Sequence, residues 1–195
     1  LRDAIVWSCF DKEDKESYNL VQEAYDRSTD FAFVFEKAIK GKKELSNIEL
    51  VPGKPIKVML ALKAENIVDG FERVGKPAAI EIKYDGFRML INKDEKGKVK
   101  IFTRRLDEVT RQFPEVEEYV KKYIKAKTFI MDTEAVGYDK KTKSYTSFQH
   151  ISQRIKRKYD IDKLQEELPV EINAFDLLYL NGKSLIDEPF EKRSK

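Results

Sequence analysis

The pattern of apolar residues changes near residue 50, and this change constrains the fold more than any other feature of the sequence. Before it, apolar residues recur at the three- and four-residue spacing of amphipathic helices, which predicts helices over residues 1–10, 17–26 and 29–40. After it, residues 79–83 alternate apolar and charged side chains, as in a strand that is buried on one face. The sequence therefore predicts a helical first part and a second part built around a sheet.

Local signals mark the ends of the predicted helices. Ser17 and Thr29 are expected to cap the second and third helix, and Gly41 is expected directly after the third. A charged stretch with Gly and Pro runs from Gly41 to Pro55. Such a stretch is typical of a linker, so we expect the domain boundary there.

The second part has the pattern of an antiparallel sheet with intervening helices. Asp85-Gly86 and Asn181-Gly182 are dipeptides typical of tight turns between antiparallel strands. The expected fold class is α+β, with a helical domain over 1–50 and a sheet domain over 51–195. Further strands are predicted at 87–91, 99–103, 129–138 and 171–180, and helices at 114–124 and 147–158.

Composition excludes several classes of protein. Of the 195 residues, 41% are hydrophobic and 37% are charged, as in globular domains with a charged surface. No apolar run approaches the roughly 20 residues that a membrane-spanning helix needs. The single cysteine, Cys9, and the single histidine, His150, exclude a disulfide framework and a zinc site built from Cys and His. We therefore expect an intracellular protein whose chemistry rests on Lys, Arg, Asp and Glu.

Positive charge belongs to the second part of the chain. The net charge is +3, although residues 1–50 carry 8 Lys and Arg against 11 Asp and Glu. Two basic clusters in the second part could follow a DNA backbone, and each is explained equally well as a solvated helix face. The clusters are Arg154, Lys156, Arg157 and Lys158, and Lys121, Lys122, Lys125 and Lys127.

The segment Glu81–Arg88 gathers residue types that lysine chemistry requires. Lys83 ends a predicted strand beside the Asp85-Gly86 turn, which would place it at a cleft. Because an ordinary lysine has a pKa of about 10.4, a nucleophilic lysine must be desolvated or surrounded by cations. Arg88, and Arg104 on the next strand, could supply those cations. The alternative is a solvated lysine on an exposed strand.

The same segment carries a family resemblance. Lys83-Tyr84-Asp85-Gly86-Phe87-Arg88 resembles motif I (Lys-x-Asp-Gly-x-Arg) of the covalent nucleotidyltransferases, which include ATP-dependent DNA ligases, RNA ligases and mRNA capping enzymes. Residues 54–61 resemble the lead-in to the ligase adenylation domain, and the motifs are most similar to those of archaeal and eukaryotic replicative DNA ligases. Later segments resemble further motifs in the family's order: Phe102–Arg105, Met131–Val136 and Ala174–Gly182.

The resemblance implies a fold and a reaction. Residues 51–195 would be an antiparallel-sheet adenylation (nucleotidyltransferase) domain, truncated before its last motifs, and residues 1–50 the C-terminal helices of a DNA-binding domain. Lys83 would attack the α-phosphate of ATP and hold AMP as a phosphoramidate. The AMP would pass to the 5′-phosphate of a nick, and the 3′-hydroxyl would displace it. ATP and Mg²⁺ are the implied cofactors.

Three residues would recognise the nucleotide by the same resemblance. Glu81 would face the adenine or its ribose, and its alternative is a charged residue on the outer face of a strand. Arg88 would bind phosphate with two donors, and its alternative is a surface ion pair. Phe175 would stack on adenine, and its alternative is a core residue, because the strand around it is apolar.

Three further residues would complete the site. Arg104 would contact the ribose or the nick phosphate. Glu134 would bind the ribose or Mg²⁺, since an acidic residue on an apolar strand is costly unless it has a partner. Asp85 would orient Lys83 or help hold the metal, and its alternative is a turn residue.

The resemblance also implies the biology of the parent protein. It would be a DNA ligase acting on nicked double-stranded DNA in replication, repair and recombination, monomeric and without a membrane partner. It would be cytoplasmic and nucleoid-associated in an archaeon, or nuclear in a eukaryote. Family members often bind a sliding clamp, although no clamp-binding peptide is recognisable here.

The activity of the fragment and the reaction of the parent protein are separate questions. No later Glu-Gly or Lys-x-Lys motif is found, so the fragment alone is expected to be inactive or weak. The motif I segment is shared with RNA ligases and capping-type nucleotidyltransferases, which is one alternative function. The other is a non-catalytic nucleic-acid-binding module in which Lys83 contacts phosphate.

Overall fold

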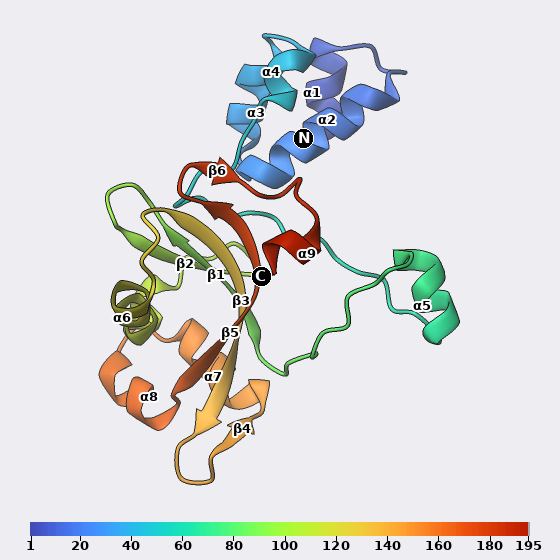
Figure 1. The fold of residues 1–195 in the computed structure, drawn as a ribbon. Helices are drawn as coiled ribbons and strands as arrows, with labels where there is room; N and C mark the ends of the chain where they lie inside the picture. The colour runs from blue at the N-terminus through green and yellow to red at the C-terminus, as the bar shows by residue number, and fades with distance from the viewer. Residues whose placement is uncertain (195) are drawn as a thin grey trace.

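A computed structural model describes residues 1–194 of the chain. It consists of a helical unit, an exposed connection and a sheet covered by helices (Figure 1). The helical unit packs around one buried apolar cluster that includes Val6, Val21 and Val34. Its helices are α1 (Arg2–Cys9), α2 (Lys15–Ser28), α3 (Phe31–Ala38) and α4 (Lys42–Ser46).

Aspartates, rather than the predicted Ser17 and Thr29, cap the helices of this unit. The Asp14 carboxylate accepts a hydrogen bond from the Glu16 backbone N–H at 3.1 Å, and Ser17 lies inside α2. Asp30 caps α3, whereas Thr29 ends α2 in the left-handed region, with φ 52°. Both predicted caps are wrong. Asp14, three residues before Ser17, and Asp30, directly after Thr29, accept hydrogen bonds from the free backbone N–H groups instead.

Gly41 follows α3, as predicted, and its N–H donates to the backbone oxygen of Ala38 at 3.0 Å. It has φ 108° and directly precedes α4, which lies in the stretch expected to be a linker. Only glycine adopts such a φ without strain. Because α4 (Lys42–Ser46) belongs to the helical unit, that unit extends through Ser46.

The second part is built on an antiparallel sheet with the strand order β2-β1-β3-β5-β6, and β4 also pairs with β3. This confirms the α+β class with antiparallel strands. The predicted strands at 87–91, 129–138 and 171–180 are confirmed to within two residues at each end, and the strand at 99–103 is confirmed at both ends. The strands are β1 (Phe87–Lys93), β2 (Val99–Thr103), β3 (Phe129–Asp139), β4 (Ser144–Thr146), β5 (Val170–Leu180) and β6 (Lys183–Ser184).

Helices surround the sheet between these strands. The Asn181-Gly182 turn is confirmed, because both residues have positive φ and Tyr179 pairs with Ser184 across it. Pro114 begins α6, as the sequence predicts. The helical elements are the 3-10 helix η1 (Thr110–Gln112), α6 (Pro114–Tyr123), α7 (Phe148–Lys156), α8 (Ile161–Glu167) and α9 (Phe190–Arg193).

Apolar clusters lie on both faces of the sheet. Met89 and Ile91 of β1 belong to the larger cluster, together with side chains of α6 and α7. Leu90 belongs to a smaller cluster on the opposite face. Because successive residues of a strand point to opposite faces, Arg88 lies on the same face as Leu90. The smaller cluster therefore borders directly on charged side chains.

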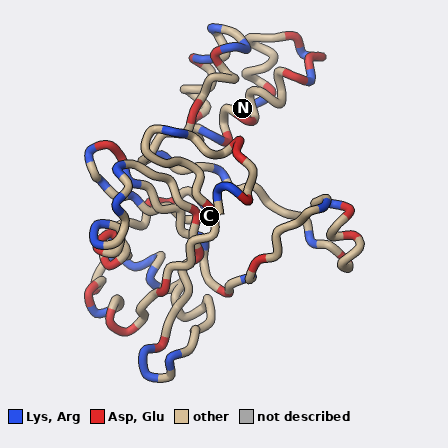
Figure 2. Tube along the Cα trace, viewed as in Figure 1, with Lys and Arg blue, Asp and Glu red and all other residues tan. Residues whose placement is uncertain are grey.

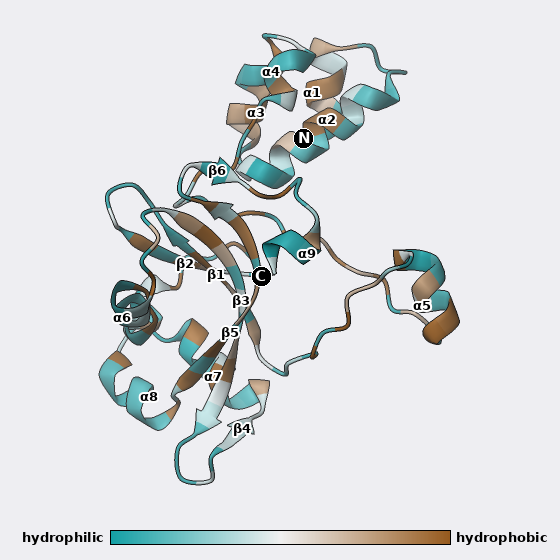
Figure 3. Ribbon diagram, viewed as in Figure 1, coloured by the Kyte–Doolittle hydropathy of each residue, from teal (hydrophilic) through white to brown (hydrophobic). Residues whose placement is uncertain are grey.

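The connection over residues 57–86 contains no buried residue. It carries α5 (Ile67–Val74), which lies away from the sheet with apolar side chains uncovered (Figures 1 and 3). The predicted strand over 79–83 is wrong here: Ile80 is 92% exposed, and no strand within residues 1–194 pairs with this segment. An alternating pattern forms a strand only where a neighbouring strand supplies backbone partners. Asp85-Gly86 is accordingly a bend that leads into β1 and not a hairpin turn.

No helix within residues 1–194 combines the length and the apolar character needed to cross a membrane.

One residue of the predicted basic clusters is buried. Arg154 is 1% exposed and donates to the two carboxylate oxygens of Glu115, at 2.6 and 3.0 Å. It also donates to the backbone oxygens of Gln112 and Leu168, and its guanidinium lies 4.3 Å from the ring centre of Phe113. Arg154 is therefore neither a DNA contact nor part of a solvated face. It joins α7 to α6.

We expect Arg154→Met to lower the free energy of unfolding by about 3–5 kcal/mol, because Glu115 would be left as a buried charge without a partner. Replacing both residues, in Arg154→Met with Glu115→Leu, should recover most of the loss. Urea unfolding measures both, with Lys156→Met on the exposed side of α7 as the control. Equal stability of Arg154→Met and the wild type would contradict the assignment.

Candidate functional site

Two adjoining clefts beside β1 contain most of the predicted site residues. The larger has a volume of about 1070 Å³ and the smaller about 470 Å³. Both are lined by Lys83 and Glu134, so the clefts meet at these two side chains. The predicted residues in the larger cleft are Lys83, Arg88, Arg104 and Glu134. Those in the smaller cleft are Glu81, Lys83, Glu134 and Phe175.

Lys83 lies two residues before the bend at Asp85-Gly86, and β1 begins four residues after Lys83. It is exposed, and its Nζ donates to the backbone oxygen of Tyr84 at 3.2 Å. The expected desolvation of this lysine is therefore not present within the described residues, because the connection that carries it packs against little else. The expected cations are present, since Arg88 and Arg104 line the same cleft.

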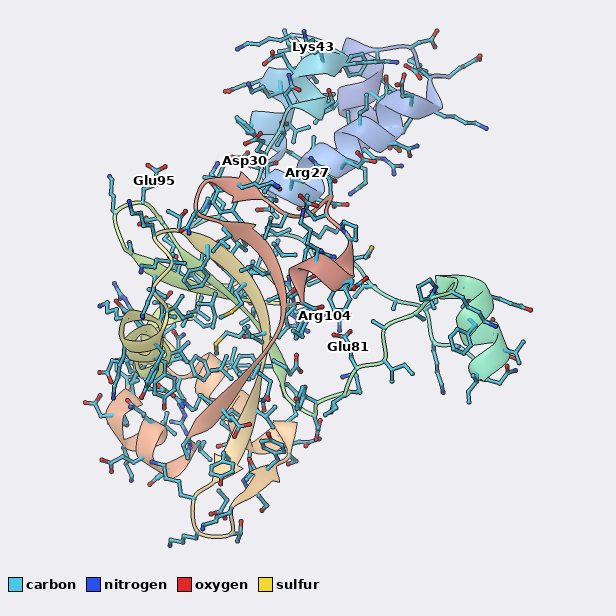
Figure 4. The ribbon with its side chains drawn as sticks, in the orientation of Figure 1. Arg27, Asp30, Lys43, Glu81, Glu95 and Arg104 are labelled. Atoms are coloured by element: carbon cyan, nitrogen blue, oxygen red, sulfur yellow. The ribbon has the colours of Figure 1, made fainter. Side chains whose placement is uncertain are left out.

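Glu81 lies on the same connection, between α5 and β1 (Figure 4). It is exposed and lines the smaller cleft with Phe175. Phe175 is partly exposed at this cleft, and it is absent from the buried clusters of the described chain. Its side chain can therefore be reached from the smaller cleft.

Gly86 allows the Lys83 segment to approach β3 closely. The Gly86 backbone N–H favours the charged form of the Glu134 carboxylate, which acts to lower the pKa of that group. A Cβ at position 86 would collide with the backbone oxygen of Ala135. The close approach therefore requires glycine and fixes the spacing between Lys83 and Glu134.

An ion pair across β1 and β3 fixes Arg88. Its Nε donates to the two carboxylate oxygens of Asp132, at 2.7 and 2.9 Å, and the two side chains are 14% and 13% exposed. Arg88 Nη1 is buried and has no hydrogen-bond partner in the described part of the chain. The pair is therefore not the surface ion pair of the alternative interpretation. It leaves one end of the guanidinium free for an anionic ligand.

Glu134 has an unfavourable environment for its charge. Burial raises its pKa, Lys83 acts in the opposite direction, and Asp132 adds to the rise. In the register of β1 and β3, Glu134 lies directly opposite Arg88. A carboxylate held in a cleft with a raised pKa is typical of functional sites.

Asp85 is the predicted site residue that lies apart. It is exposed and lines neither of the two clefts described above. Among residues 1–194, no group of three or more His, Cys, Asp or Glu side chains is arranged to hold a metal ion. Glu134 is thus the carboxylate that the fold places between the two clefts.

Sequence reasoning missed three polar residues of this region. Asp132 pairs with Arg88, Asp176 pairs with Arg193 of α9 at 2.7 Å, and Asp132 lies opposite Asp176 across β3 and β5. The spacing Asp132-x-Glu134 was a usable signal, because residues two apart on a strand share a face. Arg193 had no comparable signal, since its partner is set by tertiary packing.

Comparison with protein families gives one match over most of the chain. The model described as ATP dependent DNA ligase domain matches residues 58–195.

Similar curated proteins are archaeal DNA ligases. The DNA ligase of Nanoarchaeum equitans is 50% identical over 175 residues, which cover 89% of this chain and 30% of that protein. The DNA ligase of Thermococcus fumicolans is 39% identical over 198 residues, which cover 100% of this chain and 34% of that protein. The chain therefore spans about a third of the length of these relatives.

Among solved structures, the ligase domain of M. tuberculosis LigD aligns with a TM-score of 0.44 at 29% identity, over 58% of this chain and 33% of that chain. A mycobacterial DNA ligase D complexed with ATP and MES gives the same values.

The raised pKa of Glu134 predicts how stability depends on pH. A carboxyl whose pKa is higher in the folded than in the unfolded protein makes stability fall as pH rises from its ordinary value, 4.5, through the folded value. Glu134→Gln removes this effect while keeping an acceptor for the Gly86 N–H. We expect the variant to be at least as stable as the wild type at pH 7, with the difference shrinking toward pH of about 4.

Urea unfolding across this pH range is the measurement, and Glu118→Gln on the exposed side of α6 is the control. A marked loss of stability in Glu134→Gln at pH 7 would show that the carboxylate is held for structural reasons.

Proposed function

The chain belongs to the family of ATP-dependent DNA ligase domains, and from this premise we propose that its parent protein seals nicks in duplex DNA through AMP carried on Lys83. ATP use follows from the family. The observation that supports the proposal is the convergence of Lys83, Arg88, Arg104 and Glu134 on one cleft, with Phe175 in the adjoining one. The activity is proposed for a parent protein because the chain spans about a third of the length of the curated relatives.

In the proposed first step, Lys83 is the nucleophile. Its Nζ, after loss of a proton, forms a bond to the α-phosphorus of ATP, and the bond from that phosphorus to the bridging oxygen breaks. Pyrophosphate leaves with the electron pair, and AMP stays on Nζ as a phosphoramidate. In later steps the 5′-phosphate of a nick displaces the lysine, and the 3′-hydroxyl then displaces AMP. Three separate displacements replace one difficult exchange, as in other covalent catalysis.

The other side chains are proposed to bind and orient the nucleotide. Arg88 Nη1 is free to donate to a phosphate oxygen, because Asp132 holds the guanidinium through Nε. Arg104 lines the larger cleft and contacts the ribose or the nick phosphate. Glu81 and Phe175 line the smaller cleft, where Phe175 stacks on the adenine and Glu81 contacts the adenine or ribose.

The carboxylates near the clefts fit a Mg²⁺ ion that is bound together with a nucleotide. Mg²⁺ is usually held by one or two carboxylates together with phosphate oxygens and waters. Glu134 supplies a half-buried carboxylate between the clefts, and Asp85 is the second candidate. When bound, the ion would neutralise developing negative charge on the phosphate oxygens.

Nicked duplex DNA is the proposed macromolecular partner. Basic side chains line the larger cleft, and the exposed turn between β3 and β4 is also basic (Figure 2). Such surfaces bind phosphate backbones with a strong dependence on salt. The cleft residues are Arg104, Arg105, Lys156 and Lys158, and those of the turn are Lys140, Lys141 and Lys143.

The remaining proposals concern the parent protein as a whole. Residues 1–50 are proposed to end a DNA-binding domain, and their separate apolar cluster supports a division from the adenylation domain over 51–195. We further propose a monomer that is cytoplasmic and nucleoid-associated, acts in replication, repair and recombination, and binds a sliding clamp.

Lys83→Ala in the parent protein is expected to abolish covalent labelling by ATP radiolabelled at the α-phosphate. Acid-stable label on the wild-type protein measures the first step, and sealing of nicked DNA measures the rest. Lys63→Ala, at an exposed lysine of the same connection, should label and seal like the wild type.

Three outcomes would count against the proposal. Sealing that survives Lys83→Ala would remove the lysine mechanism. Labelling by GTP in place of ATP would favour a capping-type enzyme. Retained DNA binding without any label would favour a non-catalytic module.

The magnesium proposal makes a separate prediction. Glu134→Gln should raise the Mg²⁺ concentration for half-maximal labelling at least about tenfold, because loss of even an outer-shell partner of a metal site commonly has an effect of that size. The same titration on Asp85→Asn tests the second candidate, whose exposed position predicts a smaller shift. Equal Mg²⁺ dependence of Glu134→Gln and the wild type would exclude Glu134 as a ligand.

A further inference from the structure

Four charged side chains form a row across the face of the sheet that carries the site. Arg88 pairs with Asp132 at 2.7 Å, and Arg193 pairs with Asp176 at 2.7 Å. Asp132 and Asp176 lie directly opposite each other across β3 and β5. All four side chains are mostly buried, with exposed fractions of 13–15%. The row therefore runs from the larger cleft to α9.

The row holds two like charges side by side away from water. Coulomb repulsion between the two aspartates is weakly screened there, so each depends on its own arginine. Asp176 Oδ1 and Arg88 Nη1 are both buried without a hydrogen-bond partner in the described residues. Asp176 Oδ1 is thus an unpaired acceptor, and Arg88 Nη1 is an unpaired donor. Arg193 keeps Asp176 from competing for Arg88.

The same ion pair places α9 at the nucleotide cleft. Arg193 is the last residue of α9, and Ser194 follows it directly. Ser194 lines the smaller cleft together with Lys83, Glu134 and Phe175. α9 has only four residues, so its position depends on side-chain contacts such as the pair with Asp176 and not on its own helical stability.

We propose that Arg193 and Asp176 are positioning residues for the site: through Asp132 they keep Arg88 Nη1 free for a nucleotide phosphate, and through α9 they complete the wall of the smaller cleft. Removal of Arg193 leaves Asp176 as a buried anion beside Asp132. Arg88 then divides its donors between two aspartates, and its free end is lost to the ligand. Neither residue touches the reacting atoms.

The first test follows Arg88 itself and does not depend on activity. The side-chain Nε–H signal of Arg88 in ¹⁵N NMR spectra of the 195-residue chain reports its ion pair, and Arg88→Lys assigns it. Arg193→Met should move this signal, whereas Lys192→Met should leave it unchanged. Lys192 is the matched control because it lies on the same helix and pairs with Glu188 at the surface. An unmoved signal in folded Arg193→Met would overturn the proposal.

The second test rests on the proposed function and uses the parent protein. Arg193→Met should raise the KM for ATP in Lys83 labelling about tenfold, a change of about 1.4 kcal/mol, with a much smaller effect on the maximal rate. Arg193→Lys keeps the charge and should recover most of the affinity. Circular dichroism and thermal unfolding confirm that each variant is folded.

The outcomes separate the two proposals. If the wild type is not labelled by ATP, the proposed function fails, while the NMR test of Arg193 still stands. If the wild type is labelled but Arg193→Met has the KM of Lys192→Met, the positioning role fails and the proposed function is untouched. Equal loss in Arg193→Met and Arg193→Lys would also contradict a role based on charge.

Discussion

The pairing of β3 with both β1 and β5 is the constraint on which the rest of the structure depends. β3 pairs with β1 from Phe129 to Ala135 and with β5 from Phe129 to Gly137. This pairing sets Glu134 opposite Arg88 and Asp132 opposite Asp176. A shift of the register by one residue would send the charges to the face packed by α6 and α7. The site is therefore a consequence of strand register.

Two ion pairs on this face join buried charges of opposite sign. Arg88 and Arg193 each compensate an aspartate, which limits the destabilisation that buried charges bring. Glu134 instead meets Lys83 and the Gly86 N–H at the junction of two clefts, and burial raises its pKa. A charged group that is kept in an unfavourable environment lowers the stability of the fold, and such groups are typical of functional sites. The same surrounding leaves Arg88 Nη1 unpaired.

The sequence predicts the strands that pair within the chain, because strand periodicity is a local signal. The order of the motifs predicts that Lys83 and Glu134 belong to one site. Whether residues 79–83 form a strand could not be predicted, since alternation does not say whether a partner strand is present. Arg154 shows a second limit. Its neighbours in the sequence are exposed and basic, yet its environment is set by Glu115, which lies on another helix. Ion pairs between distant elements leave no pattern in the sequence.

Lys83 is proposed to accept AMP in the cleft bordered by Glu134 and Phe175. A crystal structure of the parent protein after incubation with ATP and Mg²⁺ tests it most directly. We predict continuous density from Lys83 Nζ to a phosphorus atom, with the adenine against Phe175 and a phosphate oxygen within hydrogen-bonding distance of Arg88 Nη1. A nucleotide bound elsewhere, or joined to another side chain, would contradict the account.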